Sequence, residues 1–257
     1  MSDSNFSELQ IDGHGVPEPR KHQTAEEFRV AGYATIDWLA DFLSSIADRP
    51  VTPKLAPGDV RALLPTQIPE EGEPFSALLD DVQKIIAPAL AHWQHPGFFG
   101  YFPANSSPPS VLGDLLSSGF GVQGMLWSTG PACTELVTHV LDQLAELCAL
   151  PACFRSDGKG GGVIQDSASS ATLCAILAAR DRSGGSNILS DLVVYTSSQA
   201  HSSVEKGARV AGFAPSRLRL IDTDANYRMD PKSLSAAIDA DLNAGLVPCI
   251  VVATVGN

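Results

Sequence analysis

Three short polar segments carry side chains that could bind or transform a small molecule. Ser167, Ala168 and Ser169 stand where a helix is expected to begin, and the free amides, dipole and hydroxyls of such a start suit a phosphate group. His201 follows a buried strand, where an imidazole can stack on a planar ligand or move a proton. Thr254 follows another strand. Each also has an ordinary explanation, as a helix cap, a loop histidine or a local backbone partner, so the residues alone leave the choice open.

Residues 93–103 form a fourth segment, dense in aromatic side chains and broken by glycine and proline, which excludes a regular helix. Such a segment either lines an apolar pocket or seals the gap between two domains, and its composition slightly favours the seal. The glycine-rich stretch Gly158–Gly162 matches neither of the common nucleotide-binding patterns, so it supports nucleotide binding only weakly.

Composition indicates a globular protein with an acidic balance. Of the 257 residues, 44% are hydrophobic and 18% charged, and 29 acidic against 17 basic residues give a formal net charge of −12. These values argue against disorder, and the negative charge argues against nucleic acid or an anionic membrane as a partner. The polar N-terminus does not resemble a secretory leader, and the longest apolar stretch, 246–255, is too short to cross a bilayer.

The cysteines show no paired spacing that would indicate a metal site or a disulfide framework. An odd number of cysteines in mostly apolar runs predicts reduced, buried thiols in a cytoplasmic protein, and no bound metal is expected. These cysteines are Cys133, Cys148, Cys153, Cys174 and Cys249.

The N-terminal part is predicted to be helical. Thr24 and Glu27 match a capping box ahead of an amphipathic helix of about six turns. After a linker punctuated by prolines, a second helix is expected to start beyond Pro74. Each helix has an apolar face to bury, and we expect a second subunit, in preference to the rest of the chain, to cover these faces. The face of the first helix comprises Phe28, Ala31, Thr35, Trp38, Leu39, Phe42 and Ile46.

From about residue 130, helices are expected to alternate with strands. Such alternation predicts the α/β class, with a mainly parallel sheet covered on both faces and ligands beyond the carboxyl ends of its strands. The sequence stops just past the last apolar strand, so the sheet is expected to be incomplete. The expected helices are 131–150, with a buried stripe of leucines and valines, 169–182, 202–211 and 231–243, and the expected strands are 192–196, 218–221 and 247–253.

Together these segments resemble the group II pyridoxal-phosphate-dependent decarboxylases, most closely the aromatic-L-amino-acid branch. The resemblance runs from about Thr24 to Asn257. It implies the fold of the PLP-dependent transferases (aspartate aminotransferase type I), with residues 106–257 as the first part of a truncated large domain. Residues 1–105 would be an arm, a helical dimerisation segment and an aromatic pocket loop. The ordered blocks that carry the resemblance are residues 93–103, 131–135, 161–171, 199–205 and 251–256.

The resemblance also implies pyridoxal 5'-phosphate as cofactor, a homodimer and a role for each matched position. Segment 167–169 would bind the cofactor phosphate. His201 would stack on the pyridine ring and act on the substrate, and Thr254 would lie near the ring. The substrate pocket, built partly across the dimer interface, would comprise Trp93, Tyr101, Phe102, Pro103 and Ala104.

Several positions depart from the family pattern. The Schiff-base lysine, and the aspartate that pairs with the ring nitrogen, belong to later segments, and none of the lysines present stands in the required context. Asp166, Ser170 and Ala104 replace a glycine, a glutamate and a threonine common among relatives. These departures bear on the substrate more than on the cofactor.

Three functional hypotheses follow from the residues and the resemblance. The leading one is PLP-dependent decarboxylation of an L-amino acid, of the aromatic class, by the complete protein, of which this chain is the N-terminal part. The second is aldehyde synthesis or aminotransfer on the same scaffold. The third is a non-catalytic product that dimerises or pairs with a separate C-terminal half.

Overall fold

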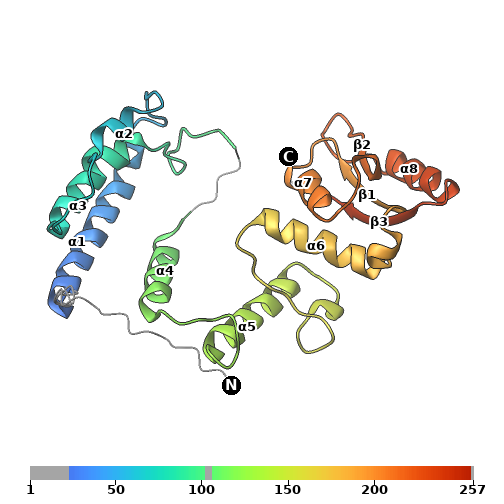
Figure 1. Ribbon diagram of the computed structural model, residues 1–257, viewed down its shortest axis with the longest axis horizontal. Coiled ribbons are helices and arrows are strands. Elements are labelled where there is room, and N and C mark those ends of the chain that lie inside the picture. The colour runs from blue at the N-terminus through green and yellow to red at the C-terminus, as the bar shows by residue number, and fades with distance from the viewer. Residues whose placement is uncertain (1–22, 102–105, 256–257) are drawn as a thin grey trace, which may run out of the picture. The chain divides into compact units, whose positions relative to one another are not determined.

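The computed structural model describes residues 23–101 and 106–255, which belong to two compact units, Met1–Gly119 and Phe120–Asn257 (Figure 1). The division of the chain into functional domains at residue 105 stays a prediction.

The first unit begins at the predicted capping box. The amide of Glu27 donates to Thr24 Oγ1 over 3.2 Å, and the amide of Thr24 donates to Glu27 Oε2 over 2.7 Å. Helix α1 then runs from Ala25 to Ser44, as the apolar spacing predicted. A short helix α2, Asp59–Leu63, lies in the linker, and α3, Phe75–Asp81, continues into a π-helical turn at Val82–Ile86.

One face of α1 packs within this unit. Ala31 is buried, and the ring of Trp38 stacks on Phe42 with centroids 5.2 Å apart. Phe42 also meets the edge of the buried His92 ring at 5.5 Å and the Arg49 guanidinium at 4.5 Å. The predicted apolar face therefore has neighbours of its own within the unit.

A second apolar stripe on α1 stays exposed. Val30 and Tyr33 are 60% and 67% exposed, and Ile36 lies one further turn along the same side. Phe28, which was expected on the packed face, is 63% exposed. No described element of the first unit covers this stripe, which we call the α1 stripe (Val30, Tyr33 and Ile36).

The second unit contains a helix whose burial was predicted wrongly. Helix α5 spans Pro131–Leu147, close to the expected range, but Leu136 is 63% and Leu147 81% exposed. Most of the leucine and valine stripe is therefore exposed, and Leu141, beside Gly162, is only partly buried. Helix α4, Pro108–Phe120, spans the boundary between the units and was not predicted.

The glycine-rich stretch is explained by close backbone packing. A Cβ atom on Gly160 would lie 1.9 Å from the carbonyl oxygen of Cys153, and one on Gly162 would lie 3.2 Å from Leu141 Cδ1. Only glycine therefore permits the chain to pass Cys153 so closely. This stretch serves chain packing, and nothing in its contacts indicates a nucleotide loop.

The centre of the second unit is a parallel three-stranded sheet in the order β2-β1-β3 (Figure 1). All six residues of β1 are buried, as expected for a central strand with helices on both sides. The strands are β1, Leu192–Ser197, β2, Leu218–Ile221, and β3, Val247–Val252, and the helices are α6, Ala168–Arg182, α7, Ser203–Val210, and α8, Pro231–Asn243.

Alternate residues of β1 face two separate apolar clusters. Leu192 and Val194 pack with Ile176 of α6 and Ala208 of α7. Val193 and Tyr195 pack on the opposite side, against residues of α8. The period of two therefore places helices on both faces of the sheet, which confirms the predicted α/β layering.

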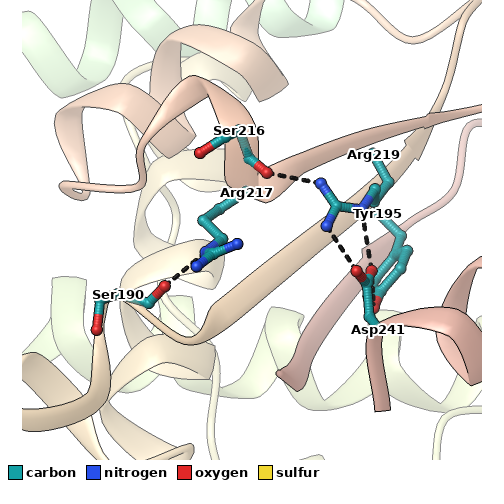
Figure 2. Close-up of polar contacts among 6 residues, drawn as sticks. All are labelled: Ser190, Tyr195, Ser216, Arg217, Arg219 and Asp241. Atoms are coloured by element: carbon teal, nitrogen blue, oxygen red, sulfur yellow. Dashed lines mark hydrogen bonds and ion pairs between the residues drawn. The ribbon is translucent and has the colours of Figure 1, made fainter. Parts of the chain in front are cut away.

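A polar network joins β1, β2 and α8 on the α8 side (Figure 2). The Tyr195 hydroxyl donates to Asp241 Oδ2 over 2.8 Å, and Arg219 donates to the same carboxylate through Nε at 3.0 Å and Nη2 at 2.5 Å. Arg219 Nη1 also donates to the carbonyl of Ser216 over 2.6 Å. The hydrogen bonds from Arg219 hold the pKa of Asp241 below its usual range, and burial raises the pKa of Tyr195.

The cysteines differ from the prediction in one respect. All five thiols are free, but Cys133, Cys148, Cys153 and Cys174 are exposed and only Cys249 is partly buried. Cys174, for example, lies on the exposed side of α6, although its neighbour Ile176 on the same helix is buried in the core. Among the described helices, none is long and apolar enough to cross a membrane.

Candidate active site

The first part of the candidate site is the start of α6. Ser167 caps the helix: the amide of Ser170 donates to Ser167 Oγ over 3.2 Å, and the amide of Ser167 donates to Ser170 Oγ over 3.2 Å. The Ser170 hydroxyl also donates to the Asp166 carboxylate. The amides of Ala168 and Ser169 belong to the first turn, before the intrahelical hydrogen bonds begin, so they are available to an anion.

The second part is the turn between β1 and α7, which carries His201. The amide of Ser198 donates to the Ile221 carbonyl over 3.1 Å and so ties the end of β1 to the end of β2. His201 Nδ1 accepts the amide of Ser203 at 3.2 Å and lies 3.0 Å from its hydroxyl. Because Nδ1 is an acceptor in this arrangement, the proton of the neutral imidazole resides on Nε2.

A pocket of about 240 Å³ lies between the starts of α6 and α7 and brings these two parts together. Its polar lining combines hydroxyls from both helices with the His201 imidazole and one lysine, and Leu173, Gly207 and Val210 supply the remainder. The polar lining residues are Ser169, Ser170, His201, Ser202, Ser203 and Lys206.

The pocket exists because the two helices approach each other closely. A Cβ atom on the buried Gly207 would lie 3.3 Å from Ile176 Cδ1 and 3.6 Å from Leu173 Cα. Glycine at this position therefore allows α7 to lie almost against the backbone of α6. The residues one turn before it, at the start of α7, are thereby held beside the start of α6.

Ser167, Ala168 and Thr254 do not line this pocket. Ser167 and Ala168 lie immediately before Ser169, at the same helix start. Thr254 is exposed and follows β3, whose Val252 carbonyl accepts the Thr196 hydroxyl of β1 over 3.1 Å. Since β1 and β3 are adjacent and parallel, Thr254 stands at the same edge of the sheet as the His201 turn.

The aromatic residues predicted for the substrate pocket belong to the first unit. Trp93 is 43% exposed, and its ring stacks with Phe98, at a centroid distance of 5.4 Å, and with Tyr101, at 5.6 Å. These rings therefore form a small exposed aromatic stack. The other predicted pocket residues, Phe102, Pro103 and Ala104, lie outside the described residues.

Ser169 and His201 were predicted as site residues, whereas Ser202, Ser203 and Lys206 of the same pocket were not. The signal was present in the spacing, because Ser203, Lys206 and Val210 recur at helical intervals and so share one side of α7. Ser169 and Leu173 are related in the same way on α6. Sequence spacing places residues on a helix face but does not say which other helix that face meets.

Comparison with known proteins agrees with this architecture. Residues 57–257 match the family model described as the pyridoxal-dependent decarboxylase conserved domain. The chain is 45% identical over 249 residues to phenylacetaldehyde synthase of Arabidopsis thaliana, covering 95% of this chain and 51% of that protein. It is 42% identical over 246 residues to aromatic-L-amino-acid decarboxylase of Rattus norvegicus, covering 91% and 51%.

Solved structures show the same relation. The crystal structure of Rhodiola rosea 4-hydroxyphenylacetaldehyde synthase superposes with a TM-score of 0.83 at 38% identity, covering 89% of this chain and 50% of that one. Catharanthus roseus tryptophan decarboxylase, solved with L-tryptophan, gives a TM-score of 0.84 at 36% identity, covering 90% and 49%. The chain thus spans about half the length of the relatives it matches.

Proposed function

Because the chain belongs to the pyridoxal-dependent decarboxylase family, we propose that the complete protein removes the carboxyl group of an L-amino acid with an aromatic side chain. The cofactor of this family is pyridoxal 5'-phosphate. The observation that carries the proposal is the pocket that unites Ser169 at the start of α6 with the His201 imidazole.

The residues of the pocket fit a planar ligand that carries a phosphate group. The amides of Ala168 and Ser169 and the Ser169 hydroxyl would donate to the phosphate at the positive end of the α6 dipole. The hydroxyl of Ser167 is already the acceptor for the Ser170 amide. It would therefore hold the shape of the helix start, and the amides would provide the binding.

His201 would act in two ways. Its ring would stack on the plane of the cofactor, and its Nε2–H would face the substrate, since Nδ1 is held by the Ser203 amide at 3.2 Å. The Nε2–H of the neutral ring would donate a hydrogen bond to the substrate carboxylate, and the protonated ring would deliver a proton to the carbon that loses the carboxyl group. Thr254, at the same edge of the sheet, would orient the ring from the end of β3.

The bound cofactor supplies an electron sink for the bond that breaks. The part of this chain in the reaction is to orient the ligand and to hold a proton near it. The stacked rings of Trp93 and Tyr101 would contribute an apolar surface for the substrate side chain.

We also infer that the α1 stripe is covered by a second copy of the chain, which would make the protein a homodimer. A cytoplasmic location is proposed on the five free thiols alone.

The test is a product assay on the complete protein with L-tyrosine, L-tryptophan and L-phenylalanine, and with L-glutamate as the non-aromatic control. We expect one carbon dioxide released for each amine formed from an aromatic substrate. Replacement His201→Ala should lower kcat by roughly 10²- to 10⁴-fold, the usual loss for a general acid or base. Decarboxylation of L-glutamate alone, or none at all, would contradict the proposal.

Aldehyde synthesis is the second candidate function, because two of the relatives reported above are named as aldehyde synthases. The same assay separates the two reactions. A decarboxylase yields the amine and carbon dioxide. An aldehyde synthase also oxidises the substrate by two electrons, so it consumes dioxygen and releases the aldehyde, carbon dioxide, ammonia and hydrogen peroxide. Equal molar amounts of aldehyde and ammonia, with no amine, would replace the first proposal by the second.

A further inference from the structure

We propose that Lys206 supplies the positive charge that holds the phosphate group of the cofactor, an inference that rests on the proposed function. Lys206 lines the same pocket as Ser169 and His201 and is the only lysine, arginine, aspartate or glutamate among the described lining residues. A dianionic phosphate bound there would find one full opposite charge.

The backbone fixes where this lysine stands. The Lys206 amide donates to the Ser202 carbonyl over 3.0 Å, so the residue belongs to the first turn of α7. The next residue, Gly207, is buried against Leu173 and Ile176 of α6. Lys206 is therefore held on the flank of α7 beside the start of α6, while its own side chain is exposed to solvent and to any ligand in the pocket.

The neighbouring charges on α7 serve each other. Glu205 Oε1 accepts from Arg209 Nη2 over 2.6 Å, and both residues line a different pocket, together with Phe213 and Leu218. Across the part of the chain that the structure describes, Lys206 is in no ion pair. Its charge is thus not neutralised within the fold.

Phosphate chemistry agrees with this placement. Amides at a helix start provide directed donors but only a fractional charge, whereas a lysine ammonium is a compact full charge on a flexible stem that can follow a phosphate oxygen. The Asp166 carboxylate at the α6 start is engaged by the Ser170 hydroxyl and does not line the pocket. The positive charge of Lys206 would therefore act on the phosphate more strongly than the negative charge of Asp166.

The experiment compares pyridoxal 5'-phosphate with pyridoxal, which lacks the phosphate, by equilibrium dialysis against the complete protein freed of its cofactor. Lys206→Gln is compared with Lys206→Arg and with Lys232→Gln, a matched loss of one positive charge on α8, outside the pocket. We expect Lys206→Gln to raise the dissociation constant of pyridoxal phosphate roughly fivefold, as for the loss of a partly exposed ion pair. The dissociation constant of pyridoxal should stay unchanged. Lys206→Arg should retain most of the affinity, and Lys232→Gln all of it.

The outcomes distinguish an error in the proposed cofactor site from an error in the role of Lys206. If the unsubstituted protein does not bind pyridoxal phosphate, the proposed cofactor site is wrong and this inference falls with it. If pyridoxal phosphate binds but Lys206→Gln lowers the affinity for neither ligand, Lys206 does not hold the phosphate. The same conclusion follows if the affinities for both ligands fall equally, because a lysine that reacts with the aldehyde would affect both. Inorganic phosphate should compete with pyridoxal phosphate in the unsubstituted protein and less effectively in Lys206→Gln. Circular dichroism of each variant checks that the fold is intact.

Discussion

At the scale of single residues, the Asp241 side chain joins three elements of the second unit, β1, β2 and α8. Its buried carboxylate accepts the Tyr195 hydroxyl of β1 and two donors from Arg219 of β2, while its own backbone belongs to α8 (Figure 2). A carboxylate removed from water is tolerated only when such partners satisfy it. The Asp241 side chain therefore anchors β1, the strand that leads to the His201 turn.

Replacing Asp241 with asparagine should destabilise the protein by about 2 kcal/mol, because the charged partner of Arg219 is lost within a buried network. Tyr195→Phe should cost less, about 1 kcal/mol, since it removes one hydrogen bond and leaves the ion pair in place. Urea unfolding followed by circular dichroism measures both. Asp239→Asn, an exposed position on α8, makes the same charge change and should leave stability nearly unaltered. Equal losses in Asp239→Asn and Asp241→Asn would show that the network is not the cause.

The same carboxylate predicts acid sensitivity. Its pKa is lower in the folded than in the unfolded chain, so its contribution to stability is complete above the unfolded value of about 3.9 and is lost as the pH falls toward the folded value. Stability curves between about pH 5 and pH 2 should therefore fall more steeply for the unsubstituted chain than for Asp241→Asn. Parallel curves would assign the acid sensitivity to other groups.

At the scale of elements, close approaches of the backbone decide how segments cross. Gly207 lets α7 lie against α6 and creates the candidate pocket, and Gly160 lets the chain pass the Cys153 carbonyl. Both positions would be read from sequence as ordinary flexible glycines. What they contribute is the absence of a Cβ atom at a contact between two segments.

Gly160→Ala should destabilise the second unit by about 2 kcal/mol, since the new Cβ would lie 1.9 Å from a carbonyl oxygen and the backbone must move. Gly158→Ala is the matched control, because its Cβ would meet its nearest atoms at 3.7 Å, an ordinary contact. That change should alter stability by less than about 1 kcal/mol. Thermal unfolding of the two variants tests the difference, and equal melting temperatures would mean that the crossing adapts without cost.

At the scale of the whole molecule, large apolar side chains stay exposed on several helices. The α1 stripe is one such surface, and the leucines of α5, with Leu147 81% exposed, are another. Exposed apolar stripes of this kind mark surfaces that a partner covers. The proposed homodimer gives the α1 stripe a function, because a second copy carries the same stripe and an isologous contact would bury both.

Tyr33→Asp should weaken the proposed dimer, since it places a charge in the middle of the α1 stripe, where burial would remove its water. We expect the dissociation constant of the dimer, measured by sedimentation velocity, to rise at least tenfold. Gln67→Glu adds the same charge at an exposed loop position of the same unit and should leave association unchanged. If both variants associate like the unsubstituted chain, the α1 stripe is not the interface.

The sequence alone determined the class of the fold and the family. The parallel strands, α8 at Pro231–Asn243 and the capping box at Thr24 follow from periodicity and capping chemistry, which act between residues near each other in the chain. The ordered blocks that indicated a pyridoxal-phosphate decarboxylase agree with the family match over residues 57–257.

Only the tertiary structure decided which residues meet. Ser169 and Lys206 share a pocket because Gly207 allows two helices to touch, and that contact has no signature in local spacing. The burial of α5 and of four cysteines was predicted wrongly for the same reason: an apolar stripe shows that a surface can be buried, whereas burial itself requires another element to lie on it. Local chemistry therefore sets the elements, and the packing of distant segments sets the site.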